Sequence, residues 1–223
     1  YDAATKTYTL KDGVPYAGEK GNVKPGMWKF KNIDGSKDNK ITEADKTVIG
    51  NAYPKIYGGI NNTFTYKDFD LSIFLTYSIG NDVFNATKLT NTKTALQNKN
   101  VLAVADSKHR WVLVNKAGDL ITDPQEMADI NKGKTVAAIY DNEAGDTYIH
   151  SWAVEDGSFL KLSNITLGYT FPKKMIRKVG LSKLRLYATG SNLLTWTKYS
   201  GFDPEVSTMG NGLTPGVDFG AYP

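Results

Sequence analysis

The chain has 223 residues and a net charge of +4, from 27 Lys and Arg against 23 Asp and Glu. Its basic residues are scattered apart from a cluster at 173–178, which is too weak a concentration of positive charge to indicate nucleic-acid binding. Cysteine is absent, which excludes disulfides, thiol nucleophiles and cysteine-bound metals. No run of 18 or more apolar residues exists, so no membrane helix is predicted, although the strands of a membrane barrel would escape this criterion.

Residues 1–55 are loop-like and contain a candidate calcium loop. Oxygen-bearing residues fall at positions 1, 3, 5, 7, 9 and 12 of an EF-hand-type loop: Asp34, Ser36, Asp38, Lys40, Thr42 and Asp45. Lys40 would contribute only its backbone carbonyl, whereas Asn39 stands at the position where such loops have Gly. The alternative is an acidic turn followed by a short helix over 42–49, capped by Thr42 and Asp45.

Residues 56–79 predict a β-hairpin. The second half alternates strictly, with apolar side chains at every odd position from Phe69 to Ile79 and mostly polar ones between them, which is the period of a strand with one apolar face. Lys67 and Asp68 form the tight turn, and Phe74 is the exception on the polar face. Both strands have about the length that crosses a bilayer when tilted.

Residues 80–157 separate this hairpin from the next one, which is far longer than loops of compact domains usually run. A helix-compatible stretch covers 86–97. Asp123 followed by Pro124 is a typical helix start, with Gly133 as its stop.

A second hairpin is predicted over 158–197. From Ile165 the alternation is strict to Phe171, a connector with Pro172 and Gly180 follows, and the return strand again alternates. Residues 198–223 are a loop rich in Gly, Pro and Asp. Short connectors at 67–68 and 172–182 thus alternate with long segments at 1–55, 80–157 and 198–223, as the short periplasmic turns and long extracellular loops of outer-membrane barrels do.

Three stretches carry a family resemblance: VEDGSFLKLSNITLGYTFP at 154–172, LSKLRLYATGSNLLTWTKYSGFDPEV at 181–206 and GVDFGAYP at 216–223. They resemble the C-terminal signature of SusC/RagA-family TonB-linked outer-membrane transporters. The resemblance implies an all-β fold, made of the C-terminal strands of a large antiparallel transmembrane β-barrel with long extracellular loops that contain short helices. Tyr1 is preceded by no start Met or signal peptide, so we expect a fragment or processed piece of such a protein.

The resemblance further implies import of glycan fragments or oligopeptides across the outer membrane, with energy from TonB delivered through an absent N-terminal part. A SusD-like surface lipoprotein is the implied partner. We expect the following residues to face lipid: Phe69, Leu71, Ile73, Leu75, Tyr77, Ile165, Leu167, Tyr169, Leu184 and Leu186. Trp196, at a strand end, is expected to anchor at the membrane interface, and Trp111 and Trp152 are candidates for substrate contact.

No catalytic constellation is present, so we expect no enzyme. His109 and His150 have no spacing typical of a metal site or a triad. Glu155 and Asp156 are adjacent in a strand-like segment, where their side chains point to opposite faces. The alternative function is a soluble secreted β-sandwich that binds carbohydrate and carries a structural calcium loop; it leaves the long segments between the hairpins unexplained.

Overall fold

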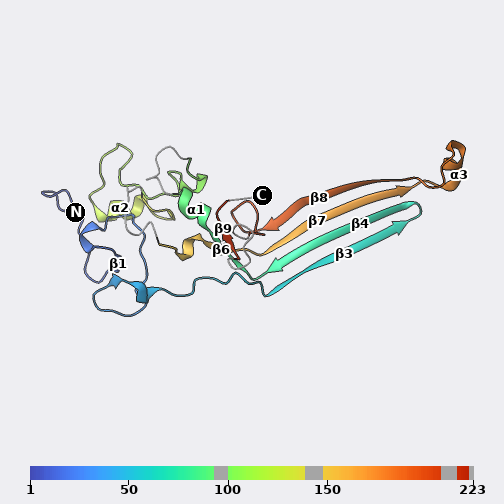
Figure 1. Cartoon of the computed structure of the whole chain (residues 1–223). Coiled ribbons are helices and arrows are strands. Elements are labelled where there is room, and N and C mark those ends of the chain that lie inside the picture. Colours follow the sequence, from blue (N-terminus) through green and yellow to red (C-terminus); the bar gives the residue numbers. More distant parts are fainter. Residues whose placement is uncertain (93–99, 139–147, 207–214, 221–223) are drawn as a thin grey trace. The chain divides into compact units, whose positions relative to one another are not determined.

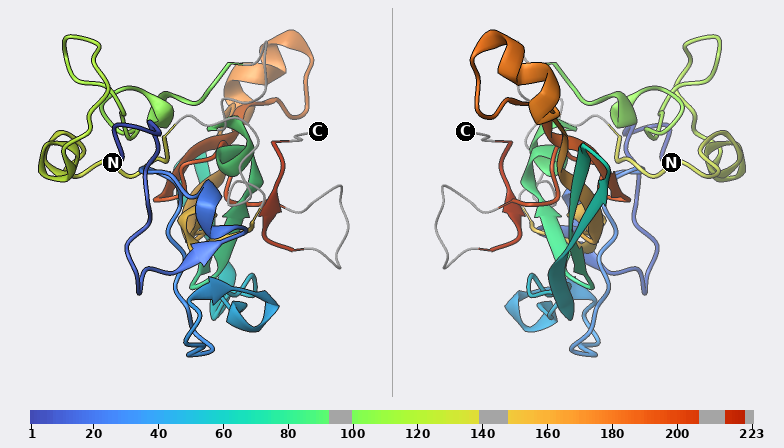
Figure 2. Two further views of the ribbon diagram at one scale, coloured as in Figure 1. Left: turned by 90° about the vertical axis from the view of Figure 1, so that its left-hand side faces the viewer. Right: turned by 90° about the vertical axis from the view of Figure 1, so that its right-hand side faces the viewer.

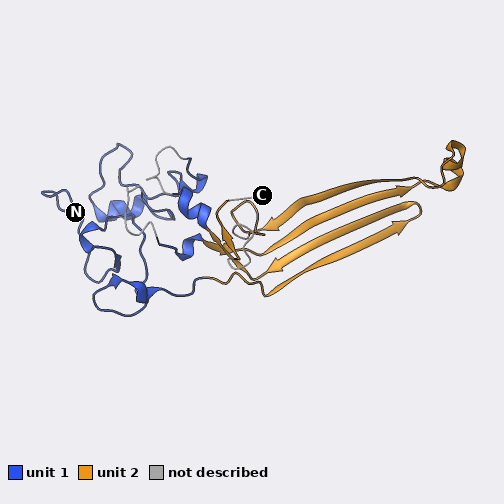
Figure 3. Ribbon diagram, in the orientation of Figure 1, with its two compact units in different colours: residues 1–49, 86–153 blue, residues 50–85, 154–223 orange. Residues whose placement is uncertain are grey.

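The computed structural model describes residues 1–92, 100–138, 148–206 and 215–220 (Figure 1). The chain divides into two compact units (Figure 3). Unit 1 comprises Tyr1–Ile49 and Ala86–Ala153, and unit 2 comprises Gly50–Asn85 and Val154–Pro223. Most of residues 1–55 and 80–157, which were expected to be separate long loops, therefore form one compact unit together, unit 1.

Unit 2 is built on a four-stranded antiparallel sheet in the order β3-β4-β7-β8. Its strands are β3 (Ile56–Tyr66), β4 (Phe69–Ile79), β7 (Phe159–Thr170) and β8 (Arg185–Thr197), which lie side by side in Figure 1 and are seen nearly end on in Figure 2. Both predicted hairpins are confirmed, and Lys67 adopts a positive φ of 53° in the tight turn between β3 and β4. In the described part of the chain, β3 pairs only with β4 and β8 only with β7.

Strand register sorts the side chains of this sheet onto two faces. Leu71 is paired with Phe64 on one side and Leu167 on the other, while the next residue, Ser72, is paired with Thr63 and Thr166. Because neighbouring side chains alternate, one face is apolar and the other mostly polar. The apolar face carries Ile60, Phe64, Tyr66, Phe69, Leu71, Ile73, Leu75, Tyr77, Leu160, Leu162, Ile165, Leu167, Tyr169, Leu186, Leu194 and Trp196.

The apolar face is not a closed core. Phe64 is 58% exposed, Leu167 51% and Leu186 59%, and none of the paired leucines and isoleucines on this face is among the buried side chains. Such a large exposed apolar surface is expected to be covered by a partner or by lipid.

A β-bulge interrupts the alternation in β7. Consecutive residues Phe74 and Leu75 of β4 pair with Asn164 and Leu162, so Ser163 is the extra residue relative to β4. On the other side, Asn192 and Leu193 of β8 stand opposite Ser163, and Asn192 has a positive φ of 51°. The bulge explains why the sequence pattern is strict only from Ile165 onward. It also keeps Leu162 and Ile165 on the same face although they are three residues apart.

An ion pair connects β8 to β4 across β7, at the end of the sheet near the short connectors. Arg185 on β8 donates from both Nε and Nη2 to the carboxylate of Asp70 on β4, and the intervening strand β7 has Gly168 between them. A Cβ at Gly168 would lie 2.5 Å from Arg185 Nη2 and 2.6 Å from the Asp70 carboxylate. Glycine is therefore what lets the guanidinium cross β7.

Smaller elements join the sheet at its two ends. The connector between β7 and β8 forms a helical turn, α3 (Lys173–Ile176) and η6 (Arg177–Val179), which ends at Gly180 with a positive φ of 76°. At the opposite end a three-stranded sheet has the order β6-β5-β9, from β5 (Asp82–Asn85), β6 (Val154–Asp156) and β9 (Val217–Asp218). The segments 1–55, 80–157 and 198–223, which were expected to be the long connectors, all join the long strands at this end of the sheet.

Unit 1 consists of short elements. Two residues each of β1 (Tyr16–Ala17) and β2 (Lys40–Ile41) pair in parallel, and the helical pieces are η1 (Lys20–Asn22), η2 (Glu43–Asp45), α1 (Ala86–Asn91), η3 (Ala103–Ala105), α2 (Pro124–Ile130) and η5 (Ser151–Ala153). In α2 the predicted start is confirmed, because the Asp123 carboxylate accepts from Glu126 N. The helix expected over 86–97 ends at Asn91, and residues 93–97 lie outside the described part of the chain.

The core of unit 1 forms around buried Ile121, Val136 and Met127. Arg110, only 6% exposed, donates to the backbone carbonyls of Ala105, Ala137 and Thr92 and so ties three segments together. Among the described residues, no helix has both the length and the apolar character needed to cross a membrane.

Candidate functional site on the polar face of the sheet

A groove of about 500 Å³ lies on unit 2, where the polar face of the sheet meets the chain that follows β8. Strand residues Tyr57, Phe74 and Phe159 supply aromatic rings to it, and residues 204–206 and 215–216 line it as well. Phe74, the one large apolar residue on the polar face of β4, covers Gly59, where a Cβ would lie 2.8 Å from the ring. Aromatic rings beside hydroxyl, amide and carboxylate groups are a composition suited to binding a polar ligand.

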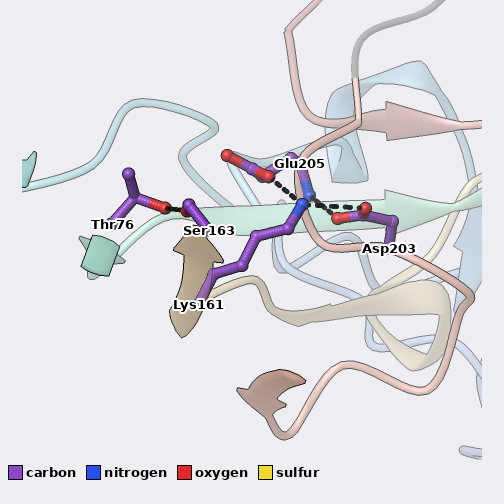
Figure 4. A network of polar contacts seen from close by, with 5 residues as sticks. All are labelled: Thr76, Lys161, Ser163, Asp203 and Glu205. Carbon is purple, nitrogen blue, oxygen red and sulfur yellow. Dashed lines mark hydrogen bonds and ion pairs between the residues drawn. The ribbon is translucent and has the colours of Figure 1, made fainter. Parts of the chain in front are cut away.

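Lys161 binds Glu205, one of the residues that line this groove (Figure 4). It projects from the polar face of β7 and is only 8% exposed. Its ammonium binds the carboxylate of Asp203 at 3.4 Å and that of Glu205, while Glu205 N donates to Asp203 Oδ1 at 2.9 Å. This cluster, Lys161, Asp203 and Glu205, holds the segment after β8 against the sheet.

Further polar contacts surround the cluster. The hydroxyls of Thr76 on β4 and Ser163, the bulge residue of β7, are 2.6 Å apart. Ser200 donates from its backbone N and its hydroxyl to the two oxygens of the Glu155 carboxylate, both at 2.8 Å. Asp156 instead accepts from Ser158 N, so the neighbouring carboxylates of Glu155 and Asp156 have separate structural partners.

The predicted calcium loop is organised around Asp45. The Asp45 carboxylate accepts from the backbone N of Thr42 at 2.8 Å, of Ile33 at 2.7 Å and of Asp34 at 3.2 Å, and these bonds, led by that from Thr42, hold the pKa of Asp45 below its usual value. Thr42 and Asp45 form the expected capping box, but on a single 3₁₀ turn, η2, and not on a helix reaching residue 49. Asn39 adopts a positive φ of 56°, as position 6 of such a loop requires.

The arrangement does not gather the calcium ligands. Asp34 accepts from Ser36 N and Asp38 from Lys40 N, and among the described residues no group of three or more acidic, histidine or cysteine side chains is placed to hold a metal ion. The calcium site formed by Asp34, Ser36, Asp38, Lys40, Thr42 and Asp45 stays a prediction.

We expect Asp45→Ala to open residues 30–46 to limited proteolysis whether or not Ca²⁺ is present, because three backbone N–H groups lose their acceptor. Asp38→Ala, which removes one local bond, is the control. Since the pKa of Asp45 is lowered, its stabilising effect is present above the ordinary value of 3.8 and is lost as the pH falls through the lowered value. Protection of wild-type protein by Ca²⁺ that Asp34→Ala abolishes would show instead that the loop closes around an ion.

The two tryptophans proposed for substrate contact lie in unit 1. Trp152 belongs to an aromatic cluster with Trp28 and His150, whose ring centroids lie 5.1 Å and 6.2 Å from its own, and the Lys88 ammonium lies 4.4 Å above its ring. Trp111 is partly buried, close to Gly26, where a Cβ would lie 3.2 Å from the Trp111 Cβ. His109 is paired with Asp106 at 2.7 Å.

Register places nine of the ten expected lipid-facing residues on the apolar face. Leu184 precedes β8, and its carbonyl accepts from Phe171 N. Trp196, paired with Leu160 near the end of β8, lies on the same face and is 52% exposed. Lipid contact of these residues and anchoring by Trp196 stay predictions.

Sequence patterns missed the Lys161 cluster, because its members are 42 and 44 residues apart. One signal was present: Lys161 is a lone cation between Leu160 and Leu162, and Asp203 and Glu205 are two acids around a proline.

Curated proteins supply the relatives of this chain. TonB-dependent receptor P3 of Formosa agariphila is 31% identical over 208 residues, which cover 91% of this chain and 18% of the relative. TonB-dependent receptor SusC of Bacteroides thetaiotaomicron is 28% identical over 193 residues, covering 86% of this chain and 16% of SusC. This chain belongs to the TonB-dependent receptors of the SusC/RagA type.

Solved structures agree on the fold. The RagAB peptide transporter matches with a TM-score of 0.58 at 22% identity, over 87% of this chain and 18% of the other. The RagAB peptide importer in the open-open state matches with a TM-score of 0.55 at 20% identity, over 84% of this chain and 18% of the other. No protein-family profile matches.

The chain thus spans less than a fifth of the receptors that it matches. TonB-dependent receptors are outer-membrane proteins, and these relatives are receptors and transporters, not enzymes. The described residues form an open sheet of four long strands and no closed barrel.

Proposed function

We propose that this chain contributes four strands and part of the rim to the barrel of a SusC/RagA-like transporter, which imports glycan fragments or oligopeptides with energy from TonB. The sheet with one exposed apolar face and one polar face carries the proposal. Its strands of 11 to 13 residues are long enough to cross the hydrocarbon layer at a tilt. The apolar face meets lipid, the polar face lines the interior, and the groove beside Lys161 opens to the solute.

Aromatic residues on the apolar face support a position in the membrane. Tyr66, Phe69 and Tyr169 lie near the short connectors, with the rings of Phe69 and Tyr169 4.6 Å apart, and Tyr77 and Trp196 lie toward the other end of the strands. Two such belts are typical of barrel walls, where amphipathic rings occupy the headgroup region on both sides. The short connectors are then periplasmic and unit 1 is extracellular.

An extracellular unit 1 would meet the proposed SusD-like surface lipoprotein, which closes over the transporter. Energy would reach the complete receptor through a segment outside this chain that contacts TonB. In transport, this chain forms part of the barrel wall and of its rim and contacts the solute. It performs no chemistry on the solute.

A soluble β-sandwich fits less well. A sandwich requires a second sheet packed on the apolar face. On the described chain, Phe64, Leu167 and Leu186 on that face are each more than half exposed.

Deletion of the gene for the full-length receptor tests the proposal. Uptake of a panel of labelled neutral and acidic oligosaccharides and of oligopeptides is measured in the wild type, the deletion strain, the complemented strain and a strain lacking TonB. We expect uptake of one solute class to be lost on deletion, restored by complementation and lost again without TonB. Unchanged uptake of every solute by the deletion strain, or uptake that persists without TonB, would refute energised import by this receptor.

A further inference from the structure

Unit 1 contains a second groove, of about 510 Å³, that the site on the sheet does not include. Its lining residues are Pro15, Lys29, Phe30, Lys31, Asn32, Gly35, Ser36 and Asn39. Two of them are cationic and none is acidic. Both lysines are exposed, and in the described part of the chain neither ammonium has a carboxylate within ion-pairing distance.

An aromatic cluster fixes the segment that presents these lysines. Trp28 and Phe30 both contact His150, with ring centroids 4.5 Å and 5.8 Å away, and Phe30 also meets Tyr148 edge to face at 5.5 Å. Residues two apart that contact the same ring lie on one side of the chain, as in extended backbone. Lys29 and Lys31, which alternate with them, are thereby directed away from the cluster as a pair.

The opposite border is a loop shaped by Asn32. Its side-chain amide donates to Ser36 O at 3.2 Å and Ser36 Oγ at 2.9 Å, and its carbonyl oxygen accepts from Gly35 N at 3.0 Å. The two acids of this loop, Asp34 and Asp38, accept from the loop's own backbone N–H groups. These two carboxylates therefore bind backbone groups of their own loop, and neither residue lines the groove.

We propose that this groove binds a carboxylate group carried by an oligomeric solute. Two ammonium groups offer donors and no acceptor, and the Ser36 hydroxyl adds a donor that can rotate toward the ligand. Phe30, whose ring packs on His150 and Tyr148, fixes the backbone between the two lysines at the edge of the groove. The inference rests on the proposed import function for its biological meaning, which is selection of acidic over neutral solutes at the rim.

Binding of tetragalacturonic acid to the purified full-length receptor in detergent, followed by calorimetry, tests this site. Maltotetraose is the neutral counterpart, and a Glu-rich tetrapeptide with its Gln-rich counterpart distinguishes a peptide source of the carboxylates from a glycan source. We expect at least one acidic probe to bind tighter than its neutral counterpart and to weaken as salt screens the charges. Lys29→Gln with Lys31→Gln should weaken that binding about 5- to 20-fold, as loss of two exposed charge contacts predicts.

Matched variants distinguish binding in the groove from a general effect of the positive charge of unit 1. Lys116→Gln with Lys132→Gln removes the same charge from exposed positions of unit 1 outside the groove, and should leave affinity unchanged. Lys29→Arg with Lys31→Arg should retain binding.

Equal affinity of the Lys29/Lys31 glutamine variant and wild type, or no binding of either acidic probe, would overturn the proposal. TonB-dependent uptake without acidic-probe binding would remove this inference alone, whereas acidic-probe binding without receptor-dependent uptake would remove the import function alone.

Discussion

Replacing Ile73 by arginine is expected to prevent assembly of the receptor in the outer membrane, while Ser72→Arg on the adjacent position is tolerated. Ile73 lies at the middle of β4 on the apolar face, paired with Ile165, and Ser72 lies on the polar face, paired with Thr63 and Thr166. An arginine that faces lipid near the bilayer midplane costs about 2–4 kcal/mol, whereas one that faces an aqueous interior keeps its hydration. The two variants have the same added charge and differ only in the face that carries it.

Heat-modifiable migration on gels and the amount of receptor in outer-membrane fractions measure the outcome. Ile73→Leu controls for loss of the branched side chain and should behave as wild type. If Ser72→Arg proved as damaging as Ile73→Arg, or both were harmless, the apolar face would not be the one in contact with lipid.

Replacing Lys161 by methionine should release residues 200–206 from the sheet and collapse the groove beside it. The ammonium is buried and is bound by Asp203 and Glu205, so its loss leaves two carboxylates facing each other without a cation. Breaking a fully buried pair costs about 3–5 kcal/mol; because both acids here are partly exposed, we expect about 1.5–3 kcal/mol for the local closure.

Hydrogen exchange of residues 198–206 in the full-length receptor reports this release. Lys198→Met, at an exposed lysine of the same unit, is the matched control and should keep wild-type protection. Lys161→Arg should retain most of it, and adding Asp203→Asn and Glu205→Gln to Lys161→Met should restore part of it, because the repulsion is removed. Unchanged protection in Lys161→Met would show that the contacts of Ser200 with Glu155 hold the segment without the lysine.

The sheet could be predicted from the sequence because its information is local. Alternation of apolar and polar residues is set by neighbouring side chains, and the bounds of β4 at Phe69 and Ile79 follow from it. The same logic failed between Leu162 and Ile165, where Ser163 is an extra residue relative to β4 and the alternation changes phase. A bulge is recognised only once the facing strand is known.

The sites were harder to predict because they depend on contacts between distant segments. Nothing near Lys161 in the sequence identifies Asp203 as its partner, and the compact packing of unit 1 around Arg110 joins residues separated by up to 27 positions. The alternative to the calcium loop, an acidic turn capped by Thr42 and Asp45, identified the cap correctly, although the helix is a single 3₁₀ turn. That the Asp45 carboxylate also accepts from Ile33 N could not be predicted from the spacing of the loop. The alternation of Trp28 and Phe30 with lysines was visible in the sequence, but its meaning required the position of His150.

The outer strands β3 and β8 have a practical consequence for anyone who produces this chain alone. Native sheets guard an open border with charged side chains, prolines or kinks. β3 has no charged residue over Ile56–Tyr66, and β8 has a single one, Arg185, at its start. Copies of the isolated chain would offer each other the unpaired backbone donors and acceptors of these two strands and join strand to strand. Association of the chain outside the intact receptor would then reflect mispairing and not its native assembly.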